Sequence, residues 1–434
     1  MLEKFIGPGS LISNRSSFIK NTLKLVLGSG IAQAITFLVS PVLTRLYTPE
    51  DLGLFTFFIS IVGFFALVAT LRYEIAIIFP KEDKDAVNIT SLSVIIALGL
   101  SFLLFILILL YRIFLSGQLP LNPVLNRWIY LLPVLVFFLG LGNIFQNWLI
   151  RKKEYRLLSS GKIINSIGNN LTALFLGLIQ IGAWGLLIGN LTGTFLFVLF
   201  LGFCIYKSGQ FRKNEFDHSS LVPLARKYKD LPASNTFQSI LETMQNYGII
   251  YLTKIFFTSS VVGFYALSLR ILQAPLWLIG SSISQVYMKD AAERFNKNEN
   301  LKELLTKTIT LSGLVALPML IVLLAGGPLL FAFIFGPSWR EAGVYAQILA
   351  PWMFFDFIRY CIAQSPLVVG KTRSMFYISI IGNVLMILSF CLGGWAFHDA
   401  KKGFLLLSIF MSLYAIGVIL WILTIVKPVK KTIE

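Results

Sequence analysis

The sequence predicts an all-α polytopic membrane protein with about twelve transmembrane helices in two parallel-repeat six-helix lobes around a central cavity. Composition is the first observation behind this prediction: the 434-residue chain is 56% hydrophobic and only 13% charged, with a mean hydropathy of +0.78. Soluble domains carry about 25% charged residues. The second observation is the length of the apolar runs, which are near the ~20 residues that cross the hydrocarbon core as a helix. The third is a resemblance between the two halves of the chain.

The apolar runs divide the chain into twelve predicted spans. We expect the first run to be a retained helix rather than a cleaved signal, because it is long and lacks a small-residue cleavage site. The stretch 328–335 is apolar but too short to cross, so we expect it in an outer loop or a re-entrant turn. The predicted spans are 21–43, 52–79, 88–111, 128–150, 161–181, 185–206, 234–256, 262–288, 304–325, 342–367, 374–395 and 403–426.

The positive charges predict the orientation of the chain. Most Lys and Arg residues fall in links on the same side as the N-terminus, including the clusters at 151–156, 226–229 and 427–431. Because cytoplasmic loops carry an excess of Lys and Arg, we expect both termini in the cytoplasm. The net charge of +17 therefore indicates contact with anionic headgroups rather than nucleic acid.

The longest predicted inner link divides the chain into two sets of six spans. The predicted parts are an N-terminal six-helix lobe (1–206), a basic cytoplasmic linker (207–233) and a C-terminal six-helix lobe (234–434). An even number of spans in each half gives the halves the same orientation. This is the arrangement of a parallel repeat, in which a transporter binds its substrate between two bundles.

The two halves carry similar short stretches at corresponding places. Both link their first span to their second through a Leu-Thr-basic triplet, a Thr and a Gly. The stretches are Leu43-Thr44-Arg45 with Thr48 and Gly53, and Leu252-Thr253-Lys254 with Thr258 and Gly263. Their agreement in position favours an internal duplication.

Polar side chains inside several predicted spans recur three or four residues apart, which places them on one face of a helix. A charge at the centre of a bilayer costs about 2.5–3.5 kcal/mol or more, so we expect charged residues to face protein or a wet cavity. Close packing of small residues is the alternative for Ser and Thr. Asp356 and Arg359, three apart, have the alternative of a structural ion pair. Glu242 and Arg270 have no charged neighbour at helical spacing and must look to another helix.

Four further charged residues lie near predicted span ends. Arg72 and Glu74 are two apart, so on a continuous helix they point to different faces. Arg72 has the alternative of snorkelling to the headgroups. Arg45 and Lys254 lie at the outer ends of the first and seventh spans, where each is either an interface anchor or part of a cavity rim.

Nothing in the sequence predicts an enzyme, a metal site or a cofactor. Cys204, Cys361 and Cys391 all lie in apolar runs, and His218 and His398 lie in predicted loops. No metal-ligand spacing or nucleophile–His–acid set is present, and there is no Gly-rich phosphate loop of the kind that binds ATP.

The stretch PVLTRLYTPEDLGLF at 41–55 resembles the first-loop signature of bacterial polysaccharide biosynthesis proteins, the O-antigen-type flippases. LRYEIAI at 71–77, Asp-Ala at 85–86, QNWLIR at 146–151 and GAWGL at 182–186 fit the same family. The resemblance is strongest over the N-terminal half. This family is the polysaccharide-transporter branch of the multidrug/oligosaccharidyl-lipid/polysaccharide exporter superfamily.

The resemblance implies a flippase in a bacterial inner membrane. Such proteins move an undecaprenyl-diphosphate-linked oligosaccharide from the cytoplasmic to the outer leaflet by alternating access, for assembly of O-antigen (and so lipopolysaccharide), capsule or exopolysaccharide. They work beside a separate polymerase and chain-length partners and do not hydrolyse ATP themselves. The coupling, whether to a proton, to a sodium ion or to the membrane potential, stays open, as do the sugar and the oligomeric state.

This substrate predicts a cationic path, because the diphosphate must have its hydration replaced and Arg is suited to bidentate phosphate contact. We expect acids to hold these cations or to couple transport, and polar and aromatic residues to line the cavity. The predicted diphosphate path is Arg45, Arg72, Lys254, Arg270 and Arg359; the cavity acids are Glu74, Glu242 and Asp356; the lining is Gln33, Asn235, Gln238, Gln273 and Trp352.

Three other functions are alternatives to the flippase. A multidrug or cation antiporter of the same superfamily needs acids to hold organic cations, and the surplus of buried arginines argues against it. A membrane glycan polymerase or ligase places catalytic residues in a large outer loop, whereas the outer loops here are short. A lipid II flippase typically has two additional helices for which this chain has no room.

Overall fold

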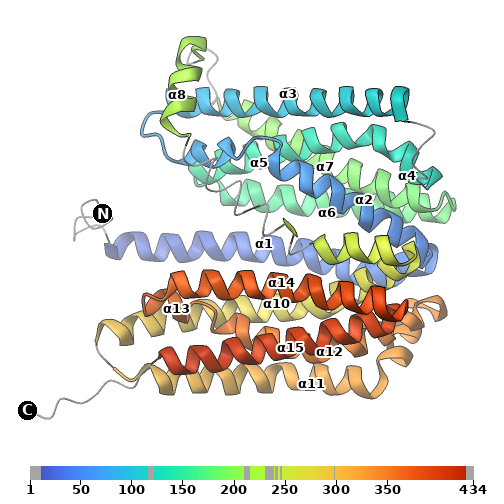
Figure 1. Ribbon diagram of the computed structural model, residues 1–434. Coiled ribbons are helices and arrows are strands. Elements are labelled where there is room, and N and C mark those ends of the chain that lie inside the picture. Colours follow the sequence, from blue (N-terminus) through green and yellow to red (C-terminus); the bar gives the residue numbers. More distant parts are fainter. Residues whose placement is uncertain are drawn as a thin grey trace, which may run out of the picture. The chain divides into compact units, whose positions relative to one another are not determined.

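The computed structural model describes residues 11–115, 122–209, 216–229, 239, 243–244, 247–297 and 299–426, with the backbone alone for 11–27 and 115. Helices make up the regular structure of these residues (Figure 1).

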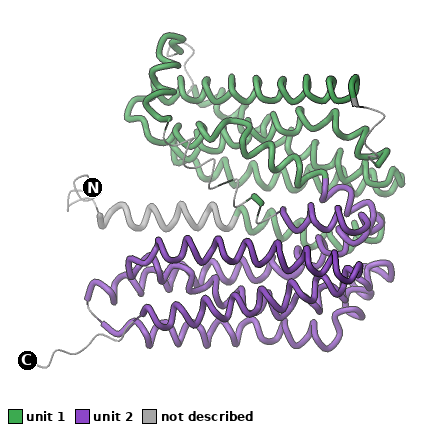
Figure 2. Tube along the Cα trace, viewed as in Figure 1, with its two compact units in different colours: residues 1–46, 58–246 green, residues 47–57, 247–434 purple. Residues whose placement is uncertain are grey.

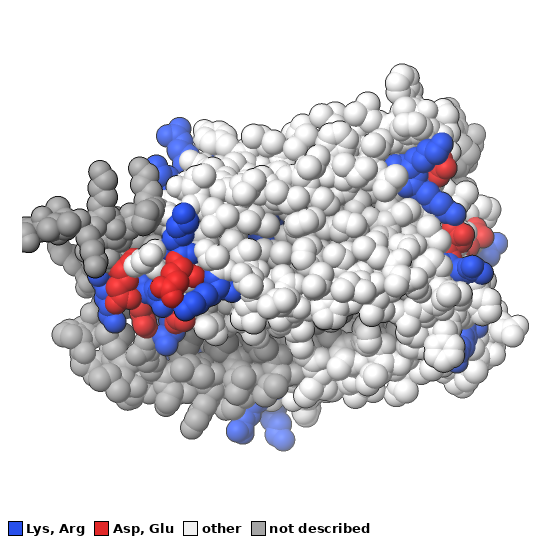
Figure 3. Space-filling view, turned by 90° about the horizontal axis from the view of Figure 1, so that it is seen from below, with Lys and Arg blue, Asp and Glu red and all other residues white. Residues whose placement is uncertain are grey.

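Within the described ranges, nine helical segments are long and apolar enough to cross a membrane. These segments lie in α1 (Leu11–Leu46), α2 (Pro49–Val68), α3 (Asp83–Leu115), α4 to α5 (Pro123–Arg151), α7 (Ala183–Lys207), α10 (Ser259–Asn296), α11 (Leu301–Phe335), α14 (Thr372–Phe397) and α15 (Ala400–Ile425). On the face shown in Figure 3, charged side chains gather at two ends and the surface between them is almost free of charge. The chain is an all-α membrane protein.

Two further helices coincide with predicted spans but carry more polar side chains. They are α6 (Tyr155–Leu178) and α12 (Arg340–Cys361), which overlap the predicted spans 161–181 and 342–367. The seventh predicted span, 234–256, lies partly outside the described residues, and its end, Tyr247–Phe256, is a short apolar helix.

The chain forms two compact units (Figure 2). Unit 1 comprises residues 1–46 and 58–246, and unit 2 comprises residues 47–57 and 247–434. The start of α2 therefore packs with unit 2 and the rest of α2 with unit 1. The predicted division into two lobes and a linker describes a repeat rather than these packing units, and it stays a prediction.

In unit 1, α6 packs against α1 and α7, and α5 (Leu132–Arg151) packs against α3 and α7. Trp148 and Leu149 of α5, together with Leu201 of α7, are fully buried in the core between these helices. Two short helices of the chain that follows α7, η4 (His218–Ser220) and α8 (Leu221–Lys227), lie against α3.

Arg151, at the end of α5, fixes the irregular segment that leads from η1 (Tyr73–Ile78) into α3. Its guanidinium donates hydrogen bonds to the backbone carbonyls of Ile77, Ile78, Pro80 and Glu82, the shortest being 2.6 Å to Pro80. It also pairs with the Asp83 carboxylate at 3.0 Å. Four backbone carbonyls of this segment thus accept hydrogen bonds from one largely buried side chain.

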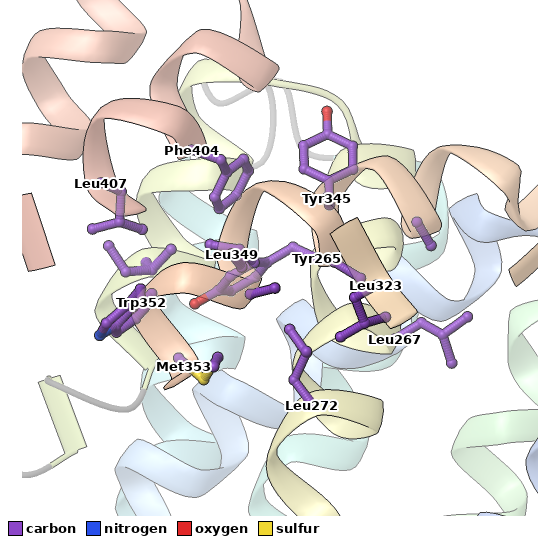
Figure 4. Close-up of a cluster of buried hydrophobic side chains, with 14 of the residues drawn as sticks. Tyr265, Leu267, Leu272, Leu323, Tyr345, Leu349, Trp352, Met353, Phe404 and Leu407 are labelled. Carbon is purple, nitrogen blue, oxygen red and sulfur yellow. The ribbon is translucent and has the colours of Figure 1, made fainter. Parts of the chain in front are cut away.

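In unit 2, α12 is the central helix and packs against α10, α11 and α15, while α14 packs against α15. The core around α12 is aromatic: Tyr265 of α10 stacks on Phe404 of α15 with ring centroids 4.8 Å apart, and Tyr345 of α12 meets the same ring edge-on at 5.2 Å. Figure 4 shows these rings around Leu349. Such pairs stabilise a core beyond the area that they bury.

The stretch 328–335, expected as an outer loop or re-entrant turn, is instead the last part of α11 beyond a kink at Gly326. Pro328 has no N–H, so the Leu324 carbonyl four residues earlier loses its helical donor. The Gln347 side-chain amide of α12 replaces it at 2.5 Å. Gly343 lets the two helices approach here, because a Cβ on it would lie 2.6 Å from Pro328 Cα.

Candidate functional site

Arg72 and Glu74 form an ion pair in unit 1, with Nη1 and Oε1 3.4 Å apart. The prediction that they point to different faces of a helix is wrong, because α2 ends at Val68. Leu71 and Arg72 then adopt left-handed backbone conformations, with φ of 48° and 63°. This turn is unusual for residues with a Cβ, and it brings the two charges to the same side.

Glu74 is the buried member of the pair, with 3% of its side chain exposed against 24% for Arg72. The Thr70 hydroxyl donates to its second carboxylate oxygen. Arg72 donates from Nε to Ser239 Oγ at 3.1 Å. Glu74 thus accepts from an arginine and a hydroxyl, and all three guanidinium nitrogens of Arg72 are engaged by Glu74 and Ser239.

The chain that follows α7 holds the segment that carries this pair. The Tyr73 hydroxyl, next to Arg72, donates to the Ala225 carbonyl of α8 at 3.1 Å. Asp217 donates its backbone N–H to Asn88 of α3 at 2.9 Å. The O–H and N–H of Ser219 hold the pKa of the Asp217 carboxyl below its usual range. The described part of the predicted linker, 216–229, is thus anchored to η1 and α3.

In unit 2, Arg270 lies in α10, eleven residues after the helix begins, which places it about 16 Å along the helix. Its side chain is exposed, and no hydrogen bond or ion pair connects it to any part of the chain that the structure describes. Gln273, three residues on, is half-buried on the same side of α10. The prediction that Arg270 looks to another helix and belongs to a diphosphate path stays a prediction.

The predicted pair on α12 forms, with Arg359 Nη2 2.6 Å and Nε 2.8 Å from Asp356 Oδ1. Beside it, Tyr360 of α12 stacks on Trp277 of α10, with ring centroids 5.6 Å apart and the planes at 26°. Gly280 lets the helices approach, because a Cβ on it would meet the Tyr360 ring at 3.1 Å. Ion pair and aromatic stack thus lie next to each other on one helix pair.

The other predicted residues are dispersed. Lys254 donates to Ser259 Oγ at 2.5 Å within unit 2, and Arg45 is exposed in the last turn of α1. Gln33 is exposed on α1. Trp352 lies in the unit 2 core with 9% exposed, and its indole N–H has no acceptor among the described residues. Glu242, Asn235 and Gln238 lie outside the described residues.

Lys162 of α6 is a cation that the sequence interpretation missed. Its Nζ donates to Ser29 Oγ of α1 at 3.0 Å, and the ion pairs of the described residues do not include it. The signal was present in the spacing, since Lys162, Ser166 and Asn170 recur every four residues within the predicted span 161–181.

Comparison with known protein families identifies the chain. The model of a family described as polysaccharide biosynthesis protein matches residues 42–343. The chain belongs to this family. The family resemblance inferred from the sequence motifs is thereby confirmed, and no curated protein matches the chain.

Solved structures of transporters share the fold of this family member. The lipid II flippase MurJ in an inward closed conformation matches with a TM-score of 0.66 at 13% identity, covering 93% of this chain and 86% of that one. A MATE in complex with MaL6 matches with a TM-score of 0.57 at 14% identity, covering 95% and 97%. A MOP superfamily transporter from Pyrococcus furiosus, for which a reverse polarity of the binding pocket is described, matches with a TM-score of 0.57 at 15% identity, covering 95% and 97%. The fold is that of MOP-superfamily transporters.

Proposed function

We propose that this polysaccharide biosynthesis protein is a flippase that moves an undecaprenyl-diphosphate-linked oligosaccharide from the cytoplasmic to the outer leaflet by alternating access. The observation that carries the proposal is Arg270, an exposed cation far along a membrane-length helix without a carboxylate in the described part of the chain. Such a charge is costly in lipid and marks a ligand path. A diphosphate supplies the missing counter-charge, and guanidinium matches phosphate geometry.

The family and the fold support this assignment. The family is described as polysaccharide biosynthesis protein, and one structure with the same fold is named a lipid II flippase. We place the protein in a bacterial inner membrane, as the family implies, with cytoplasmic termini, as the basic links predict, and with the two six-helix lobes that the repeat predicts. The product would feed O-antigen, capsule or exopolysaccharide assembly beside a polymerase.

The cavity acids favour the flippase over a multidrug antiporter, although MATE structures share the fold. An antiporter for organic cations needs carboxylates that are free to receive them. Glu74 is held by Thr70 and Arg72, and Asp356 is held by Arg359. Each of these two acids therefore already neutralises an arginine.

Deletion and complementation test the proposal. In a bacterium that lacks the gene, surface polysaccharide and cytoplasmic-leaflet lipid-linked repeat unit are both quantified. We expect polymer to be lost and unflipped repeat unit to accumulate, with rescue by the wild type and by Arg373→Ala, an exposed arginine at the start of α14. Arg270→Ala should fail at normal protein levels, and Arg270→Lys should rescue in part.

Two results would overturn the proposal. Unchanged surface polysaccharide in the deletion strain, with no second flippase expressed, would refute the substrate. Full rescue by Arg270→Ala would leave the lone cation without the role assigned to it here.

A further inference from the structure

The seam between α1 and α6 in unit 1 is polar along its length. Ser166 donates to the Ala32 carbonyl at 2.8 Å, and its oxygen lies 3.1 Å from the Thr36 hydroxyl. Asn170 donates to Thr36 Oγ1 at 3.1 Å and to the Ser166 carbonyl at 2.7 Å. These groups satisfy one another. Lys162 is the charged member of the seam and lies one turn before Ser166 on α6.

The geometry of the seam directs Lys162 towards α1. Its Nζ reaches Ser29 Oγ at 3.0 Å. One turn of α6 earlier the helices touch, because a Cβ on Gly28 would lie 2.3 Å from Ser159 Cβ. The lysine therefore sits beside a fixed helix contact, with its amine held against a neighbour rather than extended along the lipid surface.

A structural role does not explain the charge of this residue. A neutral amide or hydroxyl would make the same hydrogen bond to Ser29 without the cost of an unpaired charge in a membrane helix. One hydrogen bond uses one of the three ammonium protons of Lys162, and Ser29 keeps its own O–H as a donor because its oxygen accepts. Two donors on neighbouring helices thus remain for an anionic oxygen.

We propose that Lys162 and Ser29 form an anion subsite in unit 1 that binds a phosphate oxygen of a lipid-linked diphosphate. The proposal rests on the proposed flippase function and adds a contact that the sequence interpretation did not include. It differs from Arg72 and Arg359, whose charges are already matched by Glu74 and Asp356. The ammonium acts as a point charge and accepts phosphate without the fixed fork of an arginine.

The test measures binding of farnesyl diphosphate to the full-length protein in phosphatidylcholine nanodiscs. Lys162→Gln keeps a hydrogen-bond donor near Ser29 and removes the charge, and it should weaken binding by about tenfold or more, as loss of a charge-assisted hydrogen bond does. Lys162→Arg should bind within a few-fold of the wild type. Lys371→Gln, at an exposed lysine before α14, is the matched control and should change nothing.

A second probe separates the sources of phosphate. Phosphatidylglycerol is titrated into the same nanodiscs, and inorganic pyrophosphate is tested as a ligand without a lipid tail. Phosphatidylglycerol could compete with farnesyl diphosphate at an equal affinity and lose this competition in Lys162→Gln. That result would identify a site for lipid headgroups and overturn the assignment to the diphosphate. Weak pyrophosphate binding that still depends on Lys162 supports the subsite.

The outcomes distinguish this inference from the proposed function. Equal binding by Lys162→Gln and the wild type, with weaker binding by Arg270→Ala, overturns the subsite and leaves the flippase intact. No binding of farnesyl diphosphate by the wild type overturns both. Thermal unfolding of each variant is recorded, so that a loss of binding caused by misfolding is recognised. Lys162→Arg keeps the charge and should keep the contacts between α1 and α6.

Discussion

Gly53 of α2 and Gly263 of α10 make a reciprocal contact at the crossing of these two helices in unit 2. A Cβ on Gly53 would lie 1.7 Å from the Ser259 carbonyl oxygen, and a Cβ on Gly263 would lie 1.9 Å from the Pro49 carbonyl oxygen. Each glycine stands four residues after the carbonyl that the other approaches. This is the pattern of a self-complementary interface, and it joins the two stretches whose similarity favoured a duplication.

The reciprocal contact predicts the effect of adding one methyl group. Gly53→Ala or Gly263→Ala must force the helices apart, because a backbone carbonyl cannot move aside as a side chain can, and we expect a loss of about 1–3 kcal/mol. Thermal unfolding in detergent measures it. Gly417→Ala in α15 is the control, since nothing lies within 4 Å of a Cβ there. If the two crossing variants melt at the same temperature as Gly417→Ala, the contact between α2 and α10 is looser than described.

The α11 kink predicts a coupling between Pro328 and Gln347. Gln347→Leu should destabilise the protein by about 1–3 kcal/mol, because the Leu324 carbonyl loses its donor. In a Pro328→Ala background residue 328 regains an N–H, so the same change should cost less. A double-mutant cycle on the free energy of unfolding measures the difference. Additive effects would contradict the replacement of one donor by the other.

The hydrogen bond from Tyr73 to α8 predicts local rather than global destabilisation. Tyr73→Phe should raise hydrogen exchange in 221–227 by the equivalent of about 1 kcal/mol. Backbone amides of α5 should keep their protection. Tyr206→Phe, at a side chain that is 83% exposed, serves as the control. An unchanged exchange rate in α8 would mean that other contacts hold the helix.

Substitutions of Asp356 and Arg359 separate the two interpretations of that pair. Asp356→Asn should destabilise by about 1–3 kcal/mol, because it strands a half-buried guanidinium, and the double variant Asp356→Asn/Arg359→Gln should recover part of the loss. Rescue of surface polysaccharide is then scored for the double variant. Full rescue identifies a structural ion pair, whereas a stable but inactive protein places Arg359 on the substrate path.

The sequence predicted the helical membrane class well, because a low charge content and apolar runs of about 20 residues are what a lipid bilayer requires of a spanning helix. It also offered an Asp356–Arg359 ion pair as one of two interpretations, since a helix fixes the geometry of residues three apart. It failed at Arg72 and Glu74, because the left-handed turn at Leu71 and Arg72 contains no glycine or proline that would announce it. It missed the helix at 328–335, because the donor that continues it past Pro328 comes from Gln347, a residue distant in the sequence.

The hydrogen bonds from Arg151 to the backbone of 77–82 make one residue responsible for the conformation of the whole segment. Within residues 77–82 the guanidinium binds backbone carbonyls and no side chain, so most residues of that segment can be substituted without altering its path. Lysine has fewer donors and no rigid fork, and it would not hold so many carbonyls at once. Variation among relatives should therefore accumulate in the segment itself, while position 151 tolerates almost none.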